Sequence, residues 1–100
     1  MGKTLVKPGQ KTSEKLKEPE QYRVILLNDN YTTMIFVVAI LMEVFHKTVA
    51  EANRLMQQIH EKGWGIAGTY NWDIAVTKAE QVHAAAESNE YPLRCIVEPI

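Results

Sequence analysis

The 100-residue sequence contains only one cysteine, Cys95, so it can form neither an internal disulfide nor a CxxC metal motif. Cys95 stands in an apolar run, which favours a buried structural thiol in a reducing cytosol. The longest strongly apolar block runs from Met34 to Val44 and is broken only by Glu43. This block is far shorter than the ~20 residues that span a bilayer. We therefore expect a cytoplasmic protein that has no disulfide and does not enter a membrane.

Excess positive charge is also missing. The chain has 11 Lys and Arg residues and 12 Asp and Glu residues, and it shows no basic face or glycine-rich loop for binding phosphates. His46, His60 and His83 are scattered, and with one cysteine they do not supply the paired spacing of a zinc site. The sequence places no histidine beside Cys95 to form a nucleophile–base pair. We therefore expect no nucleic-acid binding, no metal, no cofactor and no enzymatic activity.

The N-terminal region differs in composition from the rest of the chain. Residues 1–20 contain no aromatic residue but five lysines, three glutamates and prolines at positions 8 and 19. Such a segment buries too little apolar surface to offset the entropy of ordering. It also lacks the apolar core and cleavage site of a secretory signal. The sequence predicts a disordered tail over residues 1–20 and one folded domain over residues 21–100.

The first half of the domain predicts a strand followed by two helices. β-branched and large residues predict a buried strand over Tyr22–Leu27. The length of the apolar block favours a core helix over residues 33–45, capped by Thr32 or Thr33. Thr48 and Glu51 then fit a capping box. The second helix continues with apolar residues at helical spacing and ends at Gly63.

The second half predicts a strand, a helix and a last strand. Residues 64–70 form the strand, in which Gly65 and Gly68 allow a close approach or a bulge. Asn71 can cap a third helix, whose small-residue face comprises Ala75, Ala79, Val82 and Ala86. Residues 93–98 form the last strand. The order β-α-α-β-α-β predicts an α+β fold in which three helices pack on one side of a three-stranded antiparallel sheet.

Three consecutive polar residues, Asn28-Asp29-Asn30, separate the first strand from the first helix. Asn and Asp are typical of turns and helix caps, which is the simplest interpretation. The same oxygens could instead bind an organic ammonium group; they are too few for Ca²⁺. His60 can likewise be a residue that interacts with free carbonyls at a helix end, or part of a site. Four apolar residues suit either the core or an adaptable pocket: Met34, Val37, Met56 and Ile59.

Four segments together resemble the ClpS family: "YRVILLNDNYTTMIFV", "LMQQIHEKGWGIAGTY", "AVTKAEQV" and "YPLRCIVEP". They cover almost the whole domain. The resemblance implies a fold similar to the C-terminal domain of the ribosomal stalk protein. It also implies an adaptor of the bacterial Clp protease. The sequence itself leaves the oligomeric state open, and a monomer is the default expectation. Such adaptors bind N-degron peptides and proteins that begin with Leu, Phe, Tyr or Trp, deliver them to the ClpA unfoldase of ClpAP, and modulate its choice of substrate.

The resemblance also assigns roles to individual positions. The substrate α-amino group would be bound by Asn28, Asp29, Asn30 and His60. The pocket for the first side chain would be formed by Leu26, Thr32, Met34, Val37, Met56, Ile59 and Leu93. Within it, Met34 would act as the gatekeeper that disfavours β-branched side chains. The N-terminal domain of ClpA would be contacted by Asp73, Thr77 and Lys78.

This sequence departs from the family pattern at several positions. Asn30 replaces a usual aspartate and Thr33 a usual proline, whereas Ile35 and Val76 each replace a usual acid. The departures leave a second interpretation open, in which the chain is a protein-interaction module of the same fold that no longer recognises N-termini.

Overall fold

The computed structural model of the chain describes residues 20–100. Except for Glu20, the tail predicted for residues 1–20 lies outside the described residues. The predicted β-α-α-β-α-β order is confirmed. The elements are β1 Tyr22–Leu27, α1 Met34–Glu43, α2 Val49–Lys62, β2 Trp64–Tyr70, α3 Trp72–Ser88 and β3 Arg94–Pro99.

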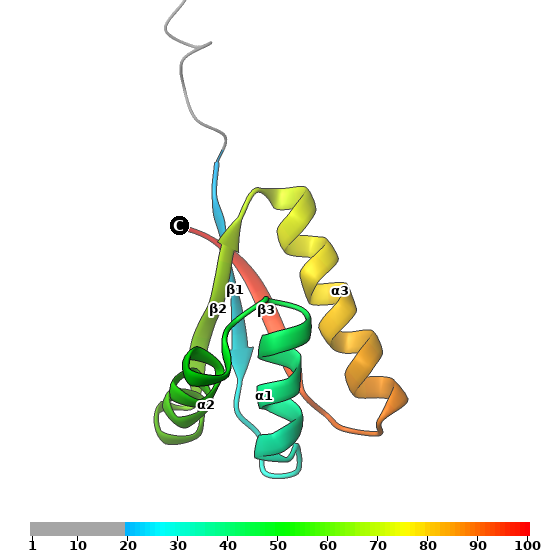
Figure 1. Cartoon of the computed structure of the whole chain (residues 1–100). Helices are drawn as coiled ribbons and strands as arrows, with labels where there is room; N and C mark the ends of the chain where they lie inside the picture. The colour runs from blue at the N-terminus through cyan, green and yellow to red at the C-terminus, as the bar shows by residue number, and fades with distance from the viewer. Residues whose placement is uncertain (1–19) are drawn as a thin grey trace, which may run out of the picture.

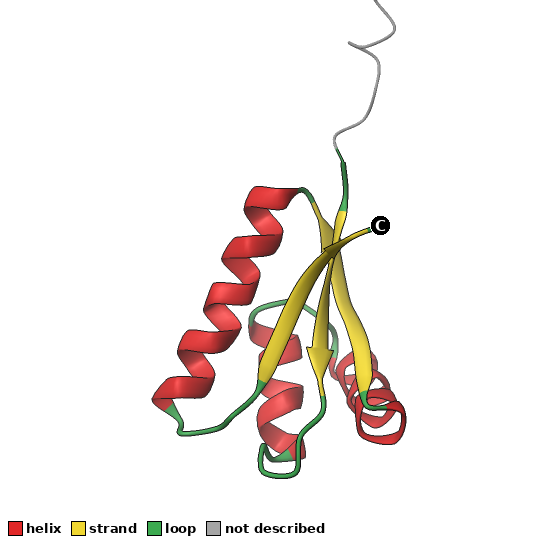
Figure 2. Ribbon diagram, turned by 180° about the vertical axis from the view of Figure 1, so that it is seen from behind, coloured by secondary structure: helices red, strands yellow, loops and turns green. Residues whose placement is uncertain are grey.

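The three strands form an antiparallel sheet in the order β2-β1-β3. Figures 1 and 2 show that all three helices cover the same face of this sheet, as the sequence predicted. Val24 and Leu26 of β1 have no exposed surface. Ile25, between them, pairs with Ile66 and Ile96 across the neighbouring strands. The central strand therefore anchors the core, and its C-terminal end carries the polar loop to the lower edge of the sheet in Figure 1.

The helices begin where side-chain caps were predicted. The Thr33 hydroxyl accepts a hydrogen bond from the Phe36 N–H at 3.2 Å. Thr48 and Glu51 form both halves of the capping box. The first helix ends at Glu43 instead of the predicted Phe45. The chain then turns, with Phe45 buried in the core and His46 in the left-handed conformation at φ 59°.

The third helix packs on the sheet through its small residues. Asn71 caps it by accepting from the Ile74 N–H at 3.1 Å. The predicted face of Ala75, Ala79, Val82 and Ala86 is buried, which lets α3 approach β1 and β3. The last strand starts at Arg94, one residue later than predicted. Within residues 20–100, no helix is both long and apolar enough to cross a bilayer.

Close contact between α2 and β2 depends on Gly65. A Cβ atom at this position would lie 2.7 Å from Cγ1 of Ile59 and 2.9 Å from Cδ1 of Leu55. Without that atom, the end of α2 can lie directly against β2. In addition, the Asn28 N–H donates to the Gly63 carbonyl at 2.9 Å. These contacts hold the end of α2 beside the loop that follows β1.

Candidate functional site

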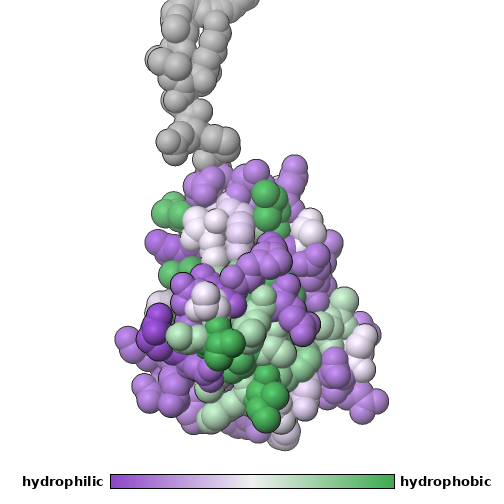
Figure 3. Space-filling view, viewed as in Figure 1, coloured by the Kyte–Doolittle hydropathy of each residue, from purple (hydrophilic) through white to green (hydrophobic). Residues whose placement is uncertain are grey.

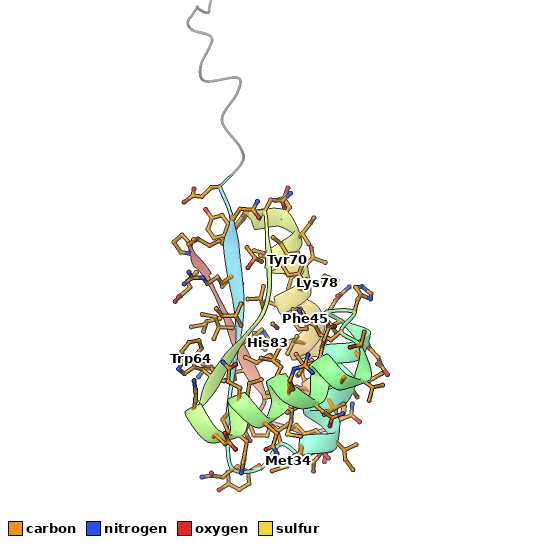
Figure 4. All side chains as sticks on the ribbon, turned by 60° about the vertical axis from the view of Figure 1, so that its left-hand side comes forward. Met34, Phe45, Trp64, Tyr70, Lys78 and His83 are labelled. Atoms are coloured by element: carbon orange, nitrogen blue, oxygen red, sulfur yellow. The ribbon has the colours of Figure 1, made fainter. Side chains whose placement is uncertain are left out.

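The end of β1, the start of α1 and the last turns of α2 surround a pocket of about 200 Å³. Its lining residues were all predicted for the site: Asn28, Asp29, Asn30, Thr32, Met34, Val37, Met56, Ile59 and His60. Drug-sized ligands usually occupy about 300–1,000 Å³. This smaller pocket suits a single side chain. Figure 4 shows Met34 at the N-terminal end of α1, at the base of the molecule.

The lining of the pocket divides into an apolar interior and a polar opening. Val37 and Ile59 are 7% and 2% exposed, so they form buried walls. Asn28, Asn30 and His60 are exposed. An apolar group can therefore be buried while a polar group attached to it stays at the opening, where hydrogen-bonding side chains surround it.

The Asp29 carboxylate organises the loop at the opening. Its Oδ1 accepts from the backbone N–H groups of Tyr31 at 2.8 Å and Thr32 at 2.7 Å. Its Oδ2 accepts from the Thr32 hydroxyl at 2.8 Å. Burial acts to raise the pKa of Asp29, but the hydrogen bonds from Thr32 and Tyr31 hold the pKa below its usual value. Asp29 therefore fixes the loop and keeps a negative charge at the opening.

Asn28 and His60 offer hydrogen-bonding groups at the same opening. Among residues 20–100 no side-chain hydrogen bond occupies the Asn28 amide or the His60 ring, although the Asn28 backbone is held by Gly63. An amide oxygen and the unprotonated nitrogen of a neutral imidazole both accept hydrogen bonds. Together with the charge of Asp29, this arrangement favours a cationic donor such as an ammonium group.

Two residues assigned to the pocket from the resemblance do not line it: Leu93, predicted as a wall, and Leu26, predicted to lie beneath the walls. Leu26 has no exposed surface and Leu93 is 3% exposed, and both belong to the main core. Leu26 lies on the helix side of the central strand, and Leu93 directly precedes β3. Both residues lie deeper than the pocket surface.

The residues predicted to contact ClpA lie on α3, whose N-terminal end is at the opposite end of the molecule from the pocket (Figure 1). Asp73 and Thr77 are exposed, and the Thr77 hydroxyl donates to the Asp73 carbonyl at 2.9 Å. Lys78 is partly buried because its ammonium group donates to the Val44 carbonyl at 2.6 Å. It also lies 5.8 Å from the centre of the Tyr70 ring (Figure 4). Lys78 therefore joins α3 to the end of α1, a role that the sequence did not predict.

The structure brings Cys95 and His83 together, which the sequence could not predict. Nε2 of His83 accepts from the Cys95 backbone N–H at 3.1 Å and lies 3.7 Å from the Cys95 sulfur. Burial raises the pKa of the Cys95 thiol to about 11. The thiol is therefore protonated near neutral pH, and the imidazole nitrogen beside it is already used as an acceptor. This pair lacks the thiolate and the free base that nucleophilic catalysis requires.

Two other kinds of candidate site in the described residues can be compared with this pocket: a metal site and a depression beside α2. Within residues 20–100, no three His, Cys, Asp or Glu side chains come close enough together to hold a metal ion. A larger depression of about 470 Å³ lies beside α2. Most of its lining side chains are charged or polar, namely Lys47, Glu51, Arg54 and Gln58, and only Leu55 and Ile66 are apolar. It therefore lacks the apolar interior of the pocket at the end of β1.

Comparison with known proteins agrees with this architecture. Residues 17–96 match the model of the family described as ATP-dependent Clp protease adaptor protein ClpS. The ATP-dependent Clp protease adapter protein ClpS of Syntrophus aciditrophicus is 56% identical over 87% of this chain and 81% of its own length. Its counterpart in Acetivibrio thermocellus is 50% identical over 97% of this chain and 96% of its own length.

A solved structure is also similar. It is that of Agrobacterium tumefaciens ClpS2 bound to L-phenylalaninamide, with a TM-score of 0.80 and 34% sequence identity. The match covers 83% of this chain and all of the other. The relatives are named as adaptors and not as enzymes. From its sequence, its fold and its relatives, the chain belongs to the ClpS family of Clp protease adaptors.

Proposed function

We propose that this adaptor binds proteins whose N-terminal residue is Leu, Phe, Tyr or Trp and delivers them to the ClpA unfoldase of the Clp protease. The observation that carries the proposal is the pocket of about 200 Å³, with apolar walls and a polar opening. The first side chain of the substrate enters the pocket. Its α-ammonium group stays at the opening, beside Asn28, Asp29 and His60.

The two parts of the pocket supply different kinds of selectivity. Burial of a Leu or Phe side chain contributes about 1.5–3 kcal/mol, but it does not distinguish the first residue from an internal one. A hydrogen bond to a charged group contributes about 1.5–3 kcal/mol, and only a free N-terminus carries the ammonium group. The walls therefore select a bulky apolar side chain, and the opening selects its position at the start of a chain.

The Agrobacterium relative supports this assignment. Its ligand, L-phenylalaninamide, has both a free α-amino group and an apolar side chain, which are the features that the pocket favours. Met34 lies at the start of α1 with 44% of its surface exposed and also lines the pocket. A side chain branched at Cβ is widest close to the backbone, and a partly exposed lining residue such as Met34 would meet that part of the substrate. We therefore assign Met34 to the exclusion of β-branched first residues.

The surface that contacts ClpA is assigned to Asp73, Thr77 and Lys78. Asp73 and Thr77 are exposed in the first turns of α3, at the end of the molecule opposite the pocket. This separation leaves the pocket open to substrate while the other end is bound to the unfoldase. The Lys78 ammonium group already bonds Val44, so its contribution includes holding α3 in place.

Fluorescence anisotropy with peptides that begin with Leu, Phe, Tyr, Trp or Ala tests the recognition of N-termini. Peptides that begin with one of the four bulky residues should bind, whereas the peptide that begins with Ala and an N-acetylated Leu peptide should bind much more weakly. Equal affinity for the free and acetylated Leu peptides would disprove amine recognition. If ClpA is then still captured in a pull-down, the chain is an interaction module of the same fold. If Asp73→Ala no longer captures ClpA but keeps its affinity for the peptides, the proposed ClpA surface on α3 is supported.

A further inference from the structure

Apolar side chains are exposed at the rim of the pocket. Ile35 and Tyr31 are 83% and 77% exposed, the highest values among the large apolar side chains of the described residues. Met34, between them, is 44% exposed. We call these three residues the apolar rim. Figure 3 shows strongly apolar surface over α1, the helix that begins at Met34 and includes Ile35.

The apolar rim is continuous with the pocket through Met34, which belongs to both. Asn30 and Thr32 also line the pocket, so Tyr31 lies between two lining residues in the chain. A single exposed apolar side chain is ordinary on a protein surface. Here three of them stand within five consecutive residues that also contribute to the pocket lining, which concentrates exposed apolar surface next to the pocket.

The opposite side of the pocket has a different chemistry. There α2 contributes Met56, Ile59 and His60 to the lining. The α2 residues that follow these, Gln57 and Glu61, are polar and exposed. The side of the opening formed by α1 is therefore apolar and uncharged, whereas the side formed by α2 is polar.

We infer that the apolar rim is a second subsite, which takes the side chain of the second residue of the substrate and favours an apolar one. This inference rests on the proposed function. Consecutive Cα atoms are about 3.8 Å apart, so the second residue must lie at the edge of a pocket that holds the first side chain. An apolar second side chain removes water from Ile35 and Tyr31. An acidic one would bring a second negative charge close to Asp29.

The test uses peptides that begin Phe-Leu, Phe-Ser and Phe-Asp and are otherwise identical. Wild-type protein should bind Phe-Leu about three- to tenfold more tightly than Phe-Ser, and Phe-Asp most weakly. The substitution Ile35→Glu should remove the advantage of Phe-Leu. The matched control is Ile74→Glu, because Ile74 is also exposed, at 46%, in the first turn of a helix distant from the pocket. This control should keep the wild-type order.

The outcomes separate the subsite from the proposed function. Acetylated Phe-Leu peptide is measured in parallel and should bind weakly. If it does, and wild-type protein binds Phe-Leu and Phe-Ser equally, the second subsite is wrong and the proposed function stands. If Ile35→Glu keeps the wild-type preference, the subsite is also wrong. If acetylation has no effect on wild-type affinity, the proposed function itself fails.

Discussion

Two histidines on helices of this adaptor have opposite environments. Nε2 of His83 accepts a hydrogen bond from the Cys95 N–H at 3.1 Å and therefore belongs to the packing between α3 and β3. His60 lies at the opening of a pocket, and among residues 20–100 no hydrogen bond to another residue occupies its ring. The sequence shows two histidines of the same kind. The structure shows one whose hydrogen bonding supports the fold and one that remains available to a ligand.

The difference extends to the surroundings of each histidine. Beside His83 is a buried thiol whose raised pKa keeps it neutral. Beside His60 are an asparagine and an aspartate that is held in its charged form. A protonated thiol beside an imidazole that already accepts a hydrogen bond contributes to the fold but offers no free group to a ligand. A charged opening next to an apolar pocket can bind an ammonium group that carries an apolar side chain.

The largest effect is expected from replacing the two histidines separately. His60→Ala should weaken binding of a Phe-initiated peptide about 10- to 150-fold, the effect of losing one hydrogen bond to a charged group. His83→Ala should leave peptide affinity unchanged and lower the free energy of unfolding by about 1 kcal/mol, because the Cys95 N–H loses its acceptor. Anisotropy and urea denaturation measure the two quantities. Equal loss of affinity in both variants would contradict the distinction.

A second effect is expected at Gly65, where β2 packs closely against Ile59 of α2. In Gly65→Ala the new methyl group would lie 2.7 Å from Ile59, a pocket wall. Overpacking of this kind should cost about 1–3 kcal/mol of stability, and the displaced wall should weaken peptide binding. Gly68→Ala is the control, because its methyl group would meet the Tyr70 ring and not the pocket. Unchanged peptide affinity in Gly65→Ala would show that Ile59 is not held in place by this contact.

A smaller effect is expected at Asp29. Asp29→Asn retains an acceptor for the Tyr31 and Thr32 N–H groups but removes the charge, so peptide affinity should fall about threefold to tenfold. The folded-state pKa of Asp29 lies below the ordinary value of 3.8. Its contribution to stability is therefore complete above pH 3.8 and is lost as the pH falls through the lowered pKa.

Urea denaturation of wild type and Asp29→Asn between pH 2 and pH 7 measures that contribution. The difference in unfolding free energy should be constant at neutral pH and shrink only in strong acid. If the difference in unfolding free energy disappears already near neutral pH, the pKa of Asp29 is not lowered by its hydrogen bonds in the folded state.

The smallest effect is expected at Cys95, which does not line the pocket, so its replacement should change stability and leave peptide affinity unchanged. Burial raises the pKa of its thiol from 9.0 to about 11, so the folded state resists ionisation that the unfolded state allows. Stability should therefore fall between pH 9 and pH 11, and this fall should be smaller in Cys95→Ala. Iodoacetamide should label the native protein slowly at pH 8 and the denatured protein quickly. Rapid labelling of the native protein would contradict the buried, neutral thiol.

The sequence predicts the fold well because the signals of each element are local. The capping box of Thr48 and Glu51 lies within four residues, and Asn71 caps its helix three residues ahead. The end of α1 was placed too late, because the turn depends on Phe45 entering the core and on His46 adopting a positive φ. The composition of one segment cannot predict where a side chain enters the core, so the sequence could not place the end of this helix.

The site was predicted only in part. The residues around the pocket could be named because the family resemblance assigns them. The hydrogen bonds of Asp29 within its own loop were not predicted, since Asn and Asp in a turn fit several arrangements. The bond from Lys78 to the Val44 carbonyl joins residues 34 positions apart. The contact of Cys95 with His83 likewise requires α3 to lie on β3. Such contacts follow from the packing of elements against one another, and the spacing of residues along the sequence does not predict them.

The central claim is that the opening of the pocket recognises a free α-ammonium group. The most direct test measures the dissociation constants of one Phe-initiated peptide, free and N-acetylated, with wild-type protein and with His60→Ala. Acetylation should weaken binding to wild type about 100-fold or more and weaken binding to His60→Ala by a much smaller factor. Equal effects of acetylation in both proteins would contradict the role of His60. Equal affinity of wild type for the two peptides would contradict amine recognition altogether.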